Sequence, residues 1–325
     1  MESKTGPARA FRWAAGALAL VFLAGLGSSA AAADGRDLYR PQADVARDPA
    51  AFYSPALYQK MGEPKPGDWM AAHPEPAQNF QEYVRSVPNR PTRARHTLVL
   101  VPVGPLDEKA RGRLKVLADF LGVYYTLPVR TEAGADLAGV KSRERTWGAK
   151  KWTQYLTGDV LQKVLRPRVK ADAFCVLGVT MEDLYPEESW NYVFGQASLA
   201  GRVGVYSLVR FYPAFWGEAE TPEADEKGLR RSLQTLVHET GHMFGVNHCQ
   251  AYECVMNGSN SLAESDARPI HLCPECLKKF RWNTGFGVVE LYRALDEFYG
   301  KQDMKDEAAW VEKRIGECGG APAEP

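Results

Sequence analysis

Net charge of either sign is absent from this 325-residue sequence, in which 40 lysines and arginines balance 40 aspartates and glutamates. Proteins that bind nucleic acids generally carry an excess of basic residues, because they must neutralise phosphates. The charge balance gives no support for a nucleic-acid partner, and we expect none.

No internal repeat is apparent. The apolar share of 45%, with 25% charged residues, argues against a largely disordered chain.

Long apolar runs are also few. The run 13-WAAGALALVFLAGLG-27 follows basic residues and precedes the small residues 28-SSAAAA-33. This order is typical of a secretory signal peptide over residues 1–33 that is cleaved after Ala33. An uncleaved membrane anchor is the alternative, but the run is shorter than the roughly 20 apolar residues that span a bilayer. We therefore predict a secreted or periplasmic protein with no stable membrane insertion after cleavage.

The mature chain divides by composition. Residues 34–95 are rich in proline and polar residues, so they are expected to form an N-terminal extension rather than a compact domain. Trp69 and Phe80 of this extension are expected to pack against the main body. The main domain is predicted over residues 96–300, and a C-terminal tail over residues 301–325.

The main domain alternates between short apolar runs and amphipathic stretches. Strands are expected at 97–103, 123–129, 173–180 and 203–211, with an edge strand at 192–198. One helix is expected from its N-cap Asp107 to Leu121, and a second over 152–164, where apolar residues recur at every fourth position before Pro167. From about Gly228, helices and loops dominate. This order predicts an α+β fold in which helices pack on a mixed, twisted sheet.

Histidine and cysteine are scarce, with six of each, yet three of the histidines fall within residues 238–248 and four of the cysteines within residues 249–276. His238 and His242 are one turn apart on a predicted helix, so both imidazoles project from one face. Gly245 permits a sharp turn that returns His248 toward them. Three neutral imidazoles leave one position of a tetrahedral zinc ion open for water. The extended spacing H-E-x-x-H-x-x-G-x-x-H is much more specific than its short form, and it predicts one zinc site.

Glu239, inside the histidine pair, bears on whether this zinc does chemistry. A structural zinc is normally closed by four protein ligands and has no use for a carboxylate beside an open position. As a general base, Glu239 would take a proton from the zinc-bound water as it attacks a carbonyl, and pass it to the leaving amine. We therefore predict a zinc-dependent peptidase. The alternative is a zinc-stabilised protein that binds peptides or proteins with little or no turnover.

The cysteines form two short pairs. Cys249 and Cys254 flank a four-residue loop, and Cys273 and Cys276 form a C-x-x-C pair, an arrangement typical of a structural zinc with four cysteine ligands. The histidine site is already complete with three ligands and water, so the cysteines predict a second zinc. Disulfides within each pair are the alternative, because an exported protein meets oxidising conditions. Cys175, in an apolar run, is expected to be a buried core thiol.

With HC-x₄-C-x-M directly after the long zinc motif and C-x-x-C further on, the sequence resembles the archaemetzincins, a metzincin family of metallopeptidases. The resemblance covers roughly residues 60–300. It implies a metzincin-like zincin fold with a mixed N-terminal sheet, an active-site helix and an irregular or helical C-terminal subdomain that holds the four-cysteine zinc. Met256 matches the Met-turn, which forms an apolar base beneath the catalytic metal.

The resemblance also has implications for the substrate. It implies that an extended peptide binds along the edge strand near Gly195 and Ala197, and that the preference is aminopeptidase-like. We expect a monomer that acts on peptides or proteins. The predicted export is a departure, since members of the family are often intracellular.

Overall fold

The computed structural model of the protein describes residues 37–40, 44, 46 and 48–318. The predicted signal peptide over residues 1–33 therefore lies outside the described residues. Among the residues that are described, we find no helix with the length and apolar character needed to cross a membrane.

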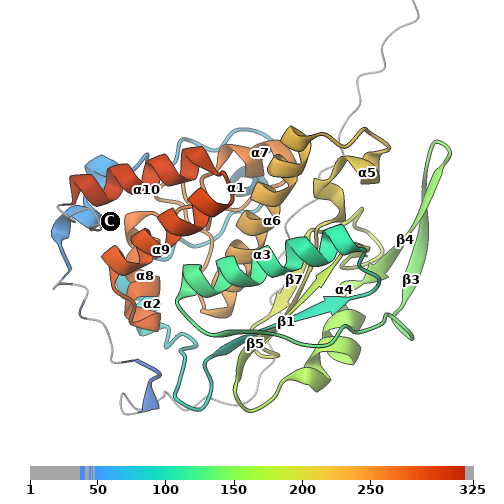
Figure 1. Ribbon diagram of the computed structural model, residues 1–325, viewed down its shortest axis with the longest axis horizontal. Coiled ribbons are helices and arrows are strands. Elements are labelled where there is room, and N and C mark those ends of the chain that lie inside the picture. The colour runs from blue at the N-terminus through green and yellow to red at the C-terminus, as the bar shows by residue number, and fades with distance from the viewer. Residues whose placement is uncertain (1–36, 41–43, 45, 47, 319–325) are drawn as a thin grey trace, which may run out of the picture.

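A five-stranded sheet forms the centre of the fold, in the order β2–β1–β5–β8–β7 (Figure 1). Its strands are β1 (Thr97–Val103), β2 (Val129–Thr131), β5 (Ala173–Thr180), β7 (Gly195–Ser198) and β8 (Val203–Ser207). Neighbouring strands are parallel except for β7 and β8, which are antiparallel. β5 is buried along its whole length, as a central strand covered on both faces should be. The sheet is mixed, as predicted, and β7 lies at its edge.

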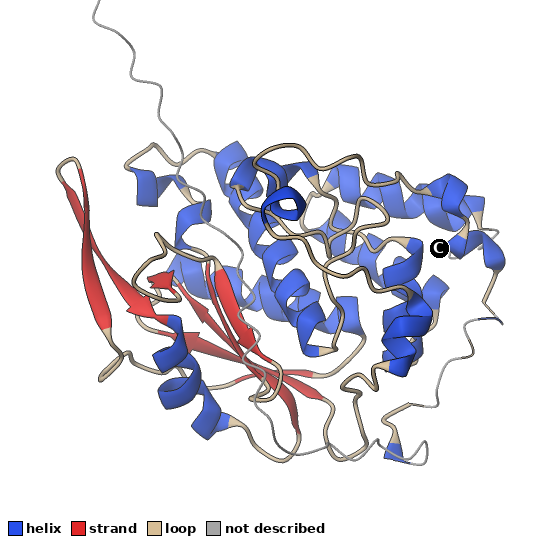
Figure 2. Ribbon diagram, turned by 180° about the vertical axis from the view of Figure 1, so that it is seen from behind, coloured by secondary structure: helices blue, strands red, loops and turns tan. Residues whose placement is uncertain are grey.

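A second sheet has three strands in the order β3–β4–β6. β3 (Ser142–Trp147) and β4 (Lys150–Leu156) form an antiparallel hairpin that projects from the body, and β4 pairs in parallel with β6 (Asp183–Tyr185) (Figures 1 and 2). The predicted helix over 152–164 is therefore wrong for residues 152–156, which lie in β4, but residues 157–164 are helical. The helical part consists of one turn, α4 (Thr157–Asp159), and a π-helix over Val160–Leu165. Pairing with β3 decides the conformation of residues 150–156. The apolar residues at every fourth position favour a helix only weakly, because periodicity in a short segment is a weak signal.

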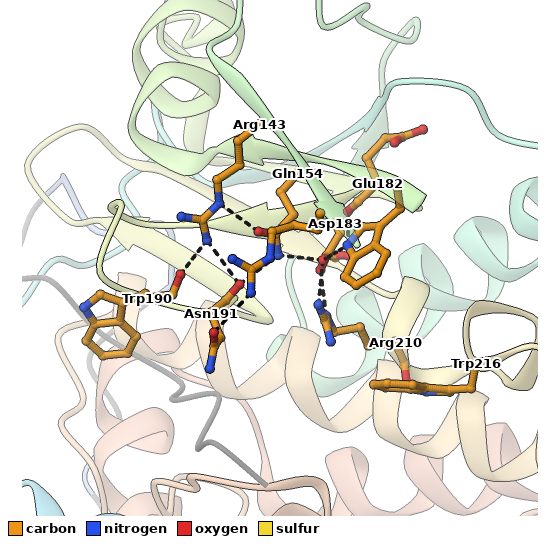
Figure 3. A network of polar contacts seen from close by, with 11 residues as sticks. Arg143, Gln154, Glu182, Asp183, Trp190, Asn191, Arg210 and Trp216 are labelled. Carbon is orange, nitrogen blue, oxygen red and sulfur yellow. Dashed lines mark hydrogen bonds and ion pairs between the residues drawn. The ribbon is translucent and has the colours of Figure 1, made fainter. Parts of the chain in front are cut away.

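A buried polar network joins this hairpin to the body (Figure 3). The carboxylate of Asp183 accepts hydrogen bonds from Nε and Nη2 of Arg210 at 2.7 and 2.6 Å, and from Nε2 of Gln154 at 2.7 Å. Nε of Arg143 on β3 donates to Oε1 of Gln154 at 2.9 Å, and its guanidinium also donates to backbone carbonyls of residues 190–191. The network therefore fixes the hairpin against the loop that leads into the edge strand β7.

Helix α3 (Glu108–Tyr125) is longer than predicted, and the expected strand over 123–129 is wrong. Asp107 is its N-cap, as predicted, with Oδ1 accepting from the backbone of Ala110 at 2.7 Å. Tyr124 and Tyr125 favour strands locally, but their buried hydroxyls donate to backbone carbonyls of distant segments, and this tertiary packing keeps them in the helix. Thr126, at φ 53°, then ends α3, so that only β2 remains of the strand.

Two other strands are shorter than predicted. The run 203–211 is extended only along β8 and then forms a 3-10 turn over Val209–Phe211. The run 192–198 is extended only along β7. Helices and loops dominate from residue 213 on, which is earlier than the predicted point near Gly228. Most of these helices lie on the side of the molecule away from the β3–β4 hairpin (Figure 2). The helices of this region are α5 (Pro213–Trp216), α6 (Pro222–Met243), α7 (Leu262–Ala267), α8 (Pro274–Thr284), α9 (Val288–Lys301) and α10 (Lys305–Glu317).

The described part of the N-terminal extension crosses these helices. It contains α1 (Trp69–Ala72) and α2 (Phe80–Arg85), and α2 packs on α8. Trp69 is 4% exposed and belongs to the core, while Phe80 is partly buried and its N–H donates to Oε2 of Glu275 at 3.0 Å. Both residues pack against the main body, as expected.

Candidate metal centre

Helix α6 carries the first two histidines of the candidate metal centre. It is capped by Thr221, whose Oγ1 accepts from the backbone of the third helical residue at 3.2 Å, and it packs against α3, β7 and β8. The helix ends just after His242, and Gly245, at φ +81°, reverses the chain. Candidate ligand atoms of His238, His242 and His248 then lie within 4.8 Å of one another, and all three side chains are buried. The structure thus brings together the three histidines of the long motif.

Hydrogen bonds at Nδ1 orient each ring. Nδ1 of His238 lies 2.7 Å from the carbonyl oxygen of Val255, Nδ1 of His242 lies 2.6 Å from that of Val246, and Nδ1 of His248 lies 2.7 Å from a carboxylate oxygen. Carbonyl and carboxylate oxygens only accept, so each Nδ1 carries a proton, and in a neutral ring Nε2 then presents a lone pair. This is the tautomer that metal-binding histidines adopt when an outer partner holds Nδ1.

The Nε2 atoms fit a divalent metal. Those of His238 and His242 face each other at 3.2 Å, and that of His248 is buried without a hydrogen-bond partner among the described residues. Burial lowers the pKa of His238 and His242 well below the usual histidine value, so both rings are neutral. Converging lone pairs without a proton between them need a cation, and three imidazoles with an open position are a donor set that zinc accepts.

Glu239 lies on the same helix, between the two histidines, and is 2% exposed. Burial raises the pKa of Glu239 to about 8, although the positive charge of Arg268 acts in the opposite direction. A carboxyl group in this range can exchange protons near neutral pH, which is what general acid–base catalysis needs.

Met256 packs directly against the helix that carries these histidines. It is fully buried, and a Cβ added to Gly241 would lie 2.6 Å from its Sδ. Gly241 precedes His242, so the thioether lies under the turn that bears the histidine pair. Glycine is needed here because the side chain of any other residue would collide with the sulfur.

The four cysteines form a second, separate group. Their thiols are free and buried, and their Sγ atoms lie within 4.8 Å of one another. Sγ of Cys249 lies 3.5 Å from that of Cys273, far beyond the disulfide length of about 2.05 Å. The N–H groups of Cys273 and Cys276 point to Sγ of Cys254 and Cys273 at 3.3 and 3.4 Å. Hydrogen bonds from the other three cysteines lower the pKa of Cys249, whereas burial raises the pKa of Cys254 and hydrogen bonds within the group raise the pKa of Cys276. A metal cation among the thiols would be needed to deprotonate all of them.

Comparison with known proteins now decides the family. Residues 136–282 match the model of peptidase family M54. The chain is 36% identical over 258 residues to archaemetzincin-2 of Homo sapiens, a match that covers 71% of each chain. The chain belongs to the archaemetzincin family. It is accordingly a zinc metallopeptidase, a hydrolase that acts on peptide or protein substrates.

More distant archaemetzincins match a smaller share of the chain. Archaemetzincin of Thermococcus kodakarensis is 33% identical over 187 residues, which are 57% of this chain and 96% of that protein. The solved structure of archaemetzincin from Archaeoglobus fulgidus complexed with malonate is 29% identical, with a TM-score of 0.43, and covers 56% of this chain and 99% of that chain.

In this archaemetzincin, Asn257 closes the loop over residues 249–257, which connects the histidine group with the cysteine group. The sequence analysis missed this residue. Nδ2 of Asn257 donates to the carbonyl oxygens of Cys249 and Tyr252 at 2.8 and 2.9 Å, and Oδ1 accepts from the N–H of Cys254 at 2.6 Å. The loop residue Val255 provides the carbonyl that holds Nδ1 of the first histidine. The cysteine group and the histidine group therefore share one loop.

Two charged residues near the histidines were also missed. Glu75 holds Nδ1 of His248; burial opposes its ionisation, but hydrogen bonds from His248 and Trp69 leave the pKa of Glu75 below its usual value. Arg268 is 2% exposed, its Nη1 donates to the carbonyl of Asn257, and Nη1 lies 3.4 Å from Nδ1 of the first histidine. No motif spacing could have found Glu75, because 173 residues separate it from its histidine.

The expected substrate strand is present as β7, and it contains both Gly195 and Ala197. A Cβ at Gly195 would lie 2.7 Å from Cδ1 of Tyr206 on β8, so packing alone requires glycine at this position. Ala197 is 4% exposed and pairs with Gly204. Neither residue is brought into contact with the histidines by the described hydrogen bonds.

Proposed function

We propose that this protein is an exported zinc peptidase with a catalytic zinc at His238, His242 and His248 and a structural zinc at the four cysteines. The observation that supports it best is the arrangement of the imidazoles. Each Nδ1 is held by an acceptor while all three Nε2 atoms converge, and a buried carboxyl group, Glu239, lies on the same helix. A site that only held the fold together would not need this carboxyl group.

The chemistry follows from these groups. Zinc held by the three Nε2 atoms would polarise the scissile carbonyl and acidify the attacking water. Glu239 accepts the proton of that water as its oxygen attacks the carbonyl carbon, and donates the proton to the amine nitrogen as the peptide bond breaks. One proton enters and leaves the carboxylate in each turnover, so Glu239 is regenerated. Burial favours this role, because exclusion of water makes the carboxylate more basic.

Three further parts of the proposal extend beyond this site. An extended peptide pairs with the edge strand β7, and cleavage is aminopeptidase-like, which the family resemblance implies. The protein acts as a monomer. Export rests on the signal-peptide pattern, and the N-terminal sequence of the secreted protein should begin at Asp34. Recovery of the intact N-terminus in the membrane fraction would instead support an anchor.

The catalytic role of Glu239 is tested by the substitution Glu239→Gln. We expect cleavage of a peptide library to fall by about 10²–10⁴-fold, the usual contribution of a general acid–base group, while both metals remain bound. Glu223→Gln, at the exposed first turn of the same helix, is the control and should cleave like the wild type. Equal residual cleavage by the wild type and Glu239→Gln would refute the assignment.

Metal content tests the number of sites. Elemental analysis should find two zinc ions per chain, and His248→Ala should lose one of them. One zinc per chain without free thiols would show that the cysteines form disulfides instead.

A further inference from the structure

His248 is held differently from the other two histidines. His238 and His242 donate to backbone carbonyls 17 and four residues away, on the same loop. His248 instead donates to the carboxylate of Glu75, at 2.7 Å from Oε1 and 3.0 Å from Oε2, across 173 residues of sequence. Glu75 lies in the N-terminal extension, outside residues 136–282 that match the family model.

The carboxylate of Glu75 is itself held in place. Nε1 of Trp69 donates to its Oε1 at 2.7 Å, and the backbone carbonyl of Glu75 accepts from Nε2 of Gln250 at 2.8 Å. The indole of Trp69 also packs edge-on against the ring of His248, with ring centroids 5.2 Å apart. Glu75 therefore has one orientation, and that orientation directs the imidazole.

Residues 78–89 of the extension cap the C-terminal end of α6, the helix that carries the first two histidines. The last carbonyls of a helix lack partners within the helix and must find them elsewhere. Asn89, Tyr83 and Gln78 supply these partners, with their side chains donating to three successive carbonyls, those of residues 243, 244 and 245, at 3.1, 2.9 and 3.1 Å. Oε1 of Gln78 also accepts from the N–H of Asn247 at 3.1 Å. The turn between the second and third histidines is thus held by side chains of residues 78–89.

We propose that the N-terminal extension supplies a built-in part of the catalytic metal site through Glu75, the positioning residue for His248, and through the side chains of Gln78, Tyr83 and Asn89 that cap the helix. The inference rests on the metal site proposed above. A carboxylate on Nδ1 orients the imidazole and makes Nε2 a better donor to the metal. The peptidase domain therefore needs the extension for metal binding, because Glu75 of the extension orients His248, the third histidine of the site.

The test measures metal binding rather than activity, with cobalt(II) as the probe. Cobalt bound by thiolates has charge-transfer absorption that cobalt bound by imidazoles lacks, so the two sites can be followed separately during titration against a chelator. We expect Glu75→Ala to weaken cobalt binding at the histidines by about 10–100-fold, the usual effect of losing an outer partner of a ligand, and to leave the cysteine site unchanged. Glu75→Gln keeps the acceptor oxygen without the charge, so it should lose less.

Glu82→Gln is the matched control. Glu82 lies in the same segment and caps α2, but its carboxylate is exposed and contacts no histidine. Its cobalt binding should equal that of the wild type. Wild-type affinity in Glu75→Ala, or equal losses in Glu75→Ala and Glu82→Gln, would overturn the inference. If Glu75→Ala does not fold, wild-type affinity in Glu75→Gln would overturn it as well.

The same titration separates this inference from the proposed function. If the wild type binds no cobalt at the histidines, the catalytic site itself is wrong. If the wild type binds cobalt and Glu75→Ala binds it equally well, only the role of Glu75 is wrong.

Discussion

Replacing Cys273 with alanine should weaken metal binding at the histidines, although Cys273 lies in the other group. The link is the loop that carries Cys254, Val255 and Met256. Cys254 belongs to the cysteine group, Val255 holds Nδ1 of His238 at 2.7 Å, and Met256 packs beneath the helix. Loss of the structural zinc proposed above would release this loop, so the contacts of the loop with the histidine site would no longer be held.

The size of the effect follows from two hydrogen bonds. The carbonyl of Val255 accepts from His238 at 2.7 Å, and the carbonyl of Met256 accepts from the N–H of Cys249 at 2.8 Å. Each such bond contributes about 1 kcal/mol net. Their combined loss, about 2 kcal/mol, corresponds to roughly 30-fold weaker metal binding at about 1.4 kcal/mol per tenfold change.

The assay is a zinc titration of the metal-free protein against a chelator, combined with peptide turnover. Cys175→Ala is the control, because Cys175 is as fully buried as Cys273 but lies in β5, outside the cysteine group. We expect the control to lose stability through a small cavity and to keep its zinc affinity at the histidines. Unchanged affinity and turnover in Cys273→Ala would refute the reasoning, and so would an equal loss of affinity in Cys175→Ala.

The remaining predictions concern packing and the polar network. Gly241→Ala should lower the free energy of unfolding by about 1–3 kcal/mol in denaturant titrations, since the added Cβ would collide with Met256. Gly112→Ala in α3 is the control, because a Cβ there meets open space, and this substitution should be neutral or stabilising. Wild-type stability in Gly241→Ala would contradict this packing. Asp183→Asn should cost about 3–5 kcal/mol, because it leaves a buried guanidinium without its counter-charge. Glu297→Gln breaks an exposed ion pair and should leave the free energy of unfolding nearly unchanged, and equal effects of the two substitutions would count against the network.

Apolar runs in the sequence predicted secondary structure correctly where the conformation of the run did not depend on contacts with distant segments. The runs 97–103 and 173–180 are strands as predicted, because short β-branched apolar runs bounded by turns have few other ways to be buried. The run 123–129 and the first part of the run 152–164, up to residue 156, were predicted wrongly, because other segments decided their conformation. Tyr124 and Tyr125 belong to α3, where their hydroxyls donate hydrogen bonds to backbone carbonyls of distant segments. The residues up to 156 belong to β4, because they pair with β3.

The sequence by itself determined the convergence of the three histidines, since helical spacing places His238 and His242 on one face and Gly245 permits the turn that returns His248. It also determined that histidines and cysteines form two groups, because short spacings limit how far such residues can separate. Only the tertiary structure decided what holds each ring. Glu75 reaches His248 across 173 residues, and the helix end is capped from the same distant segment. Such contacts depend on how the chain packs on itself, and no spacing within the motif records them.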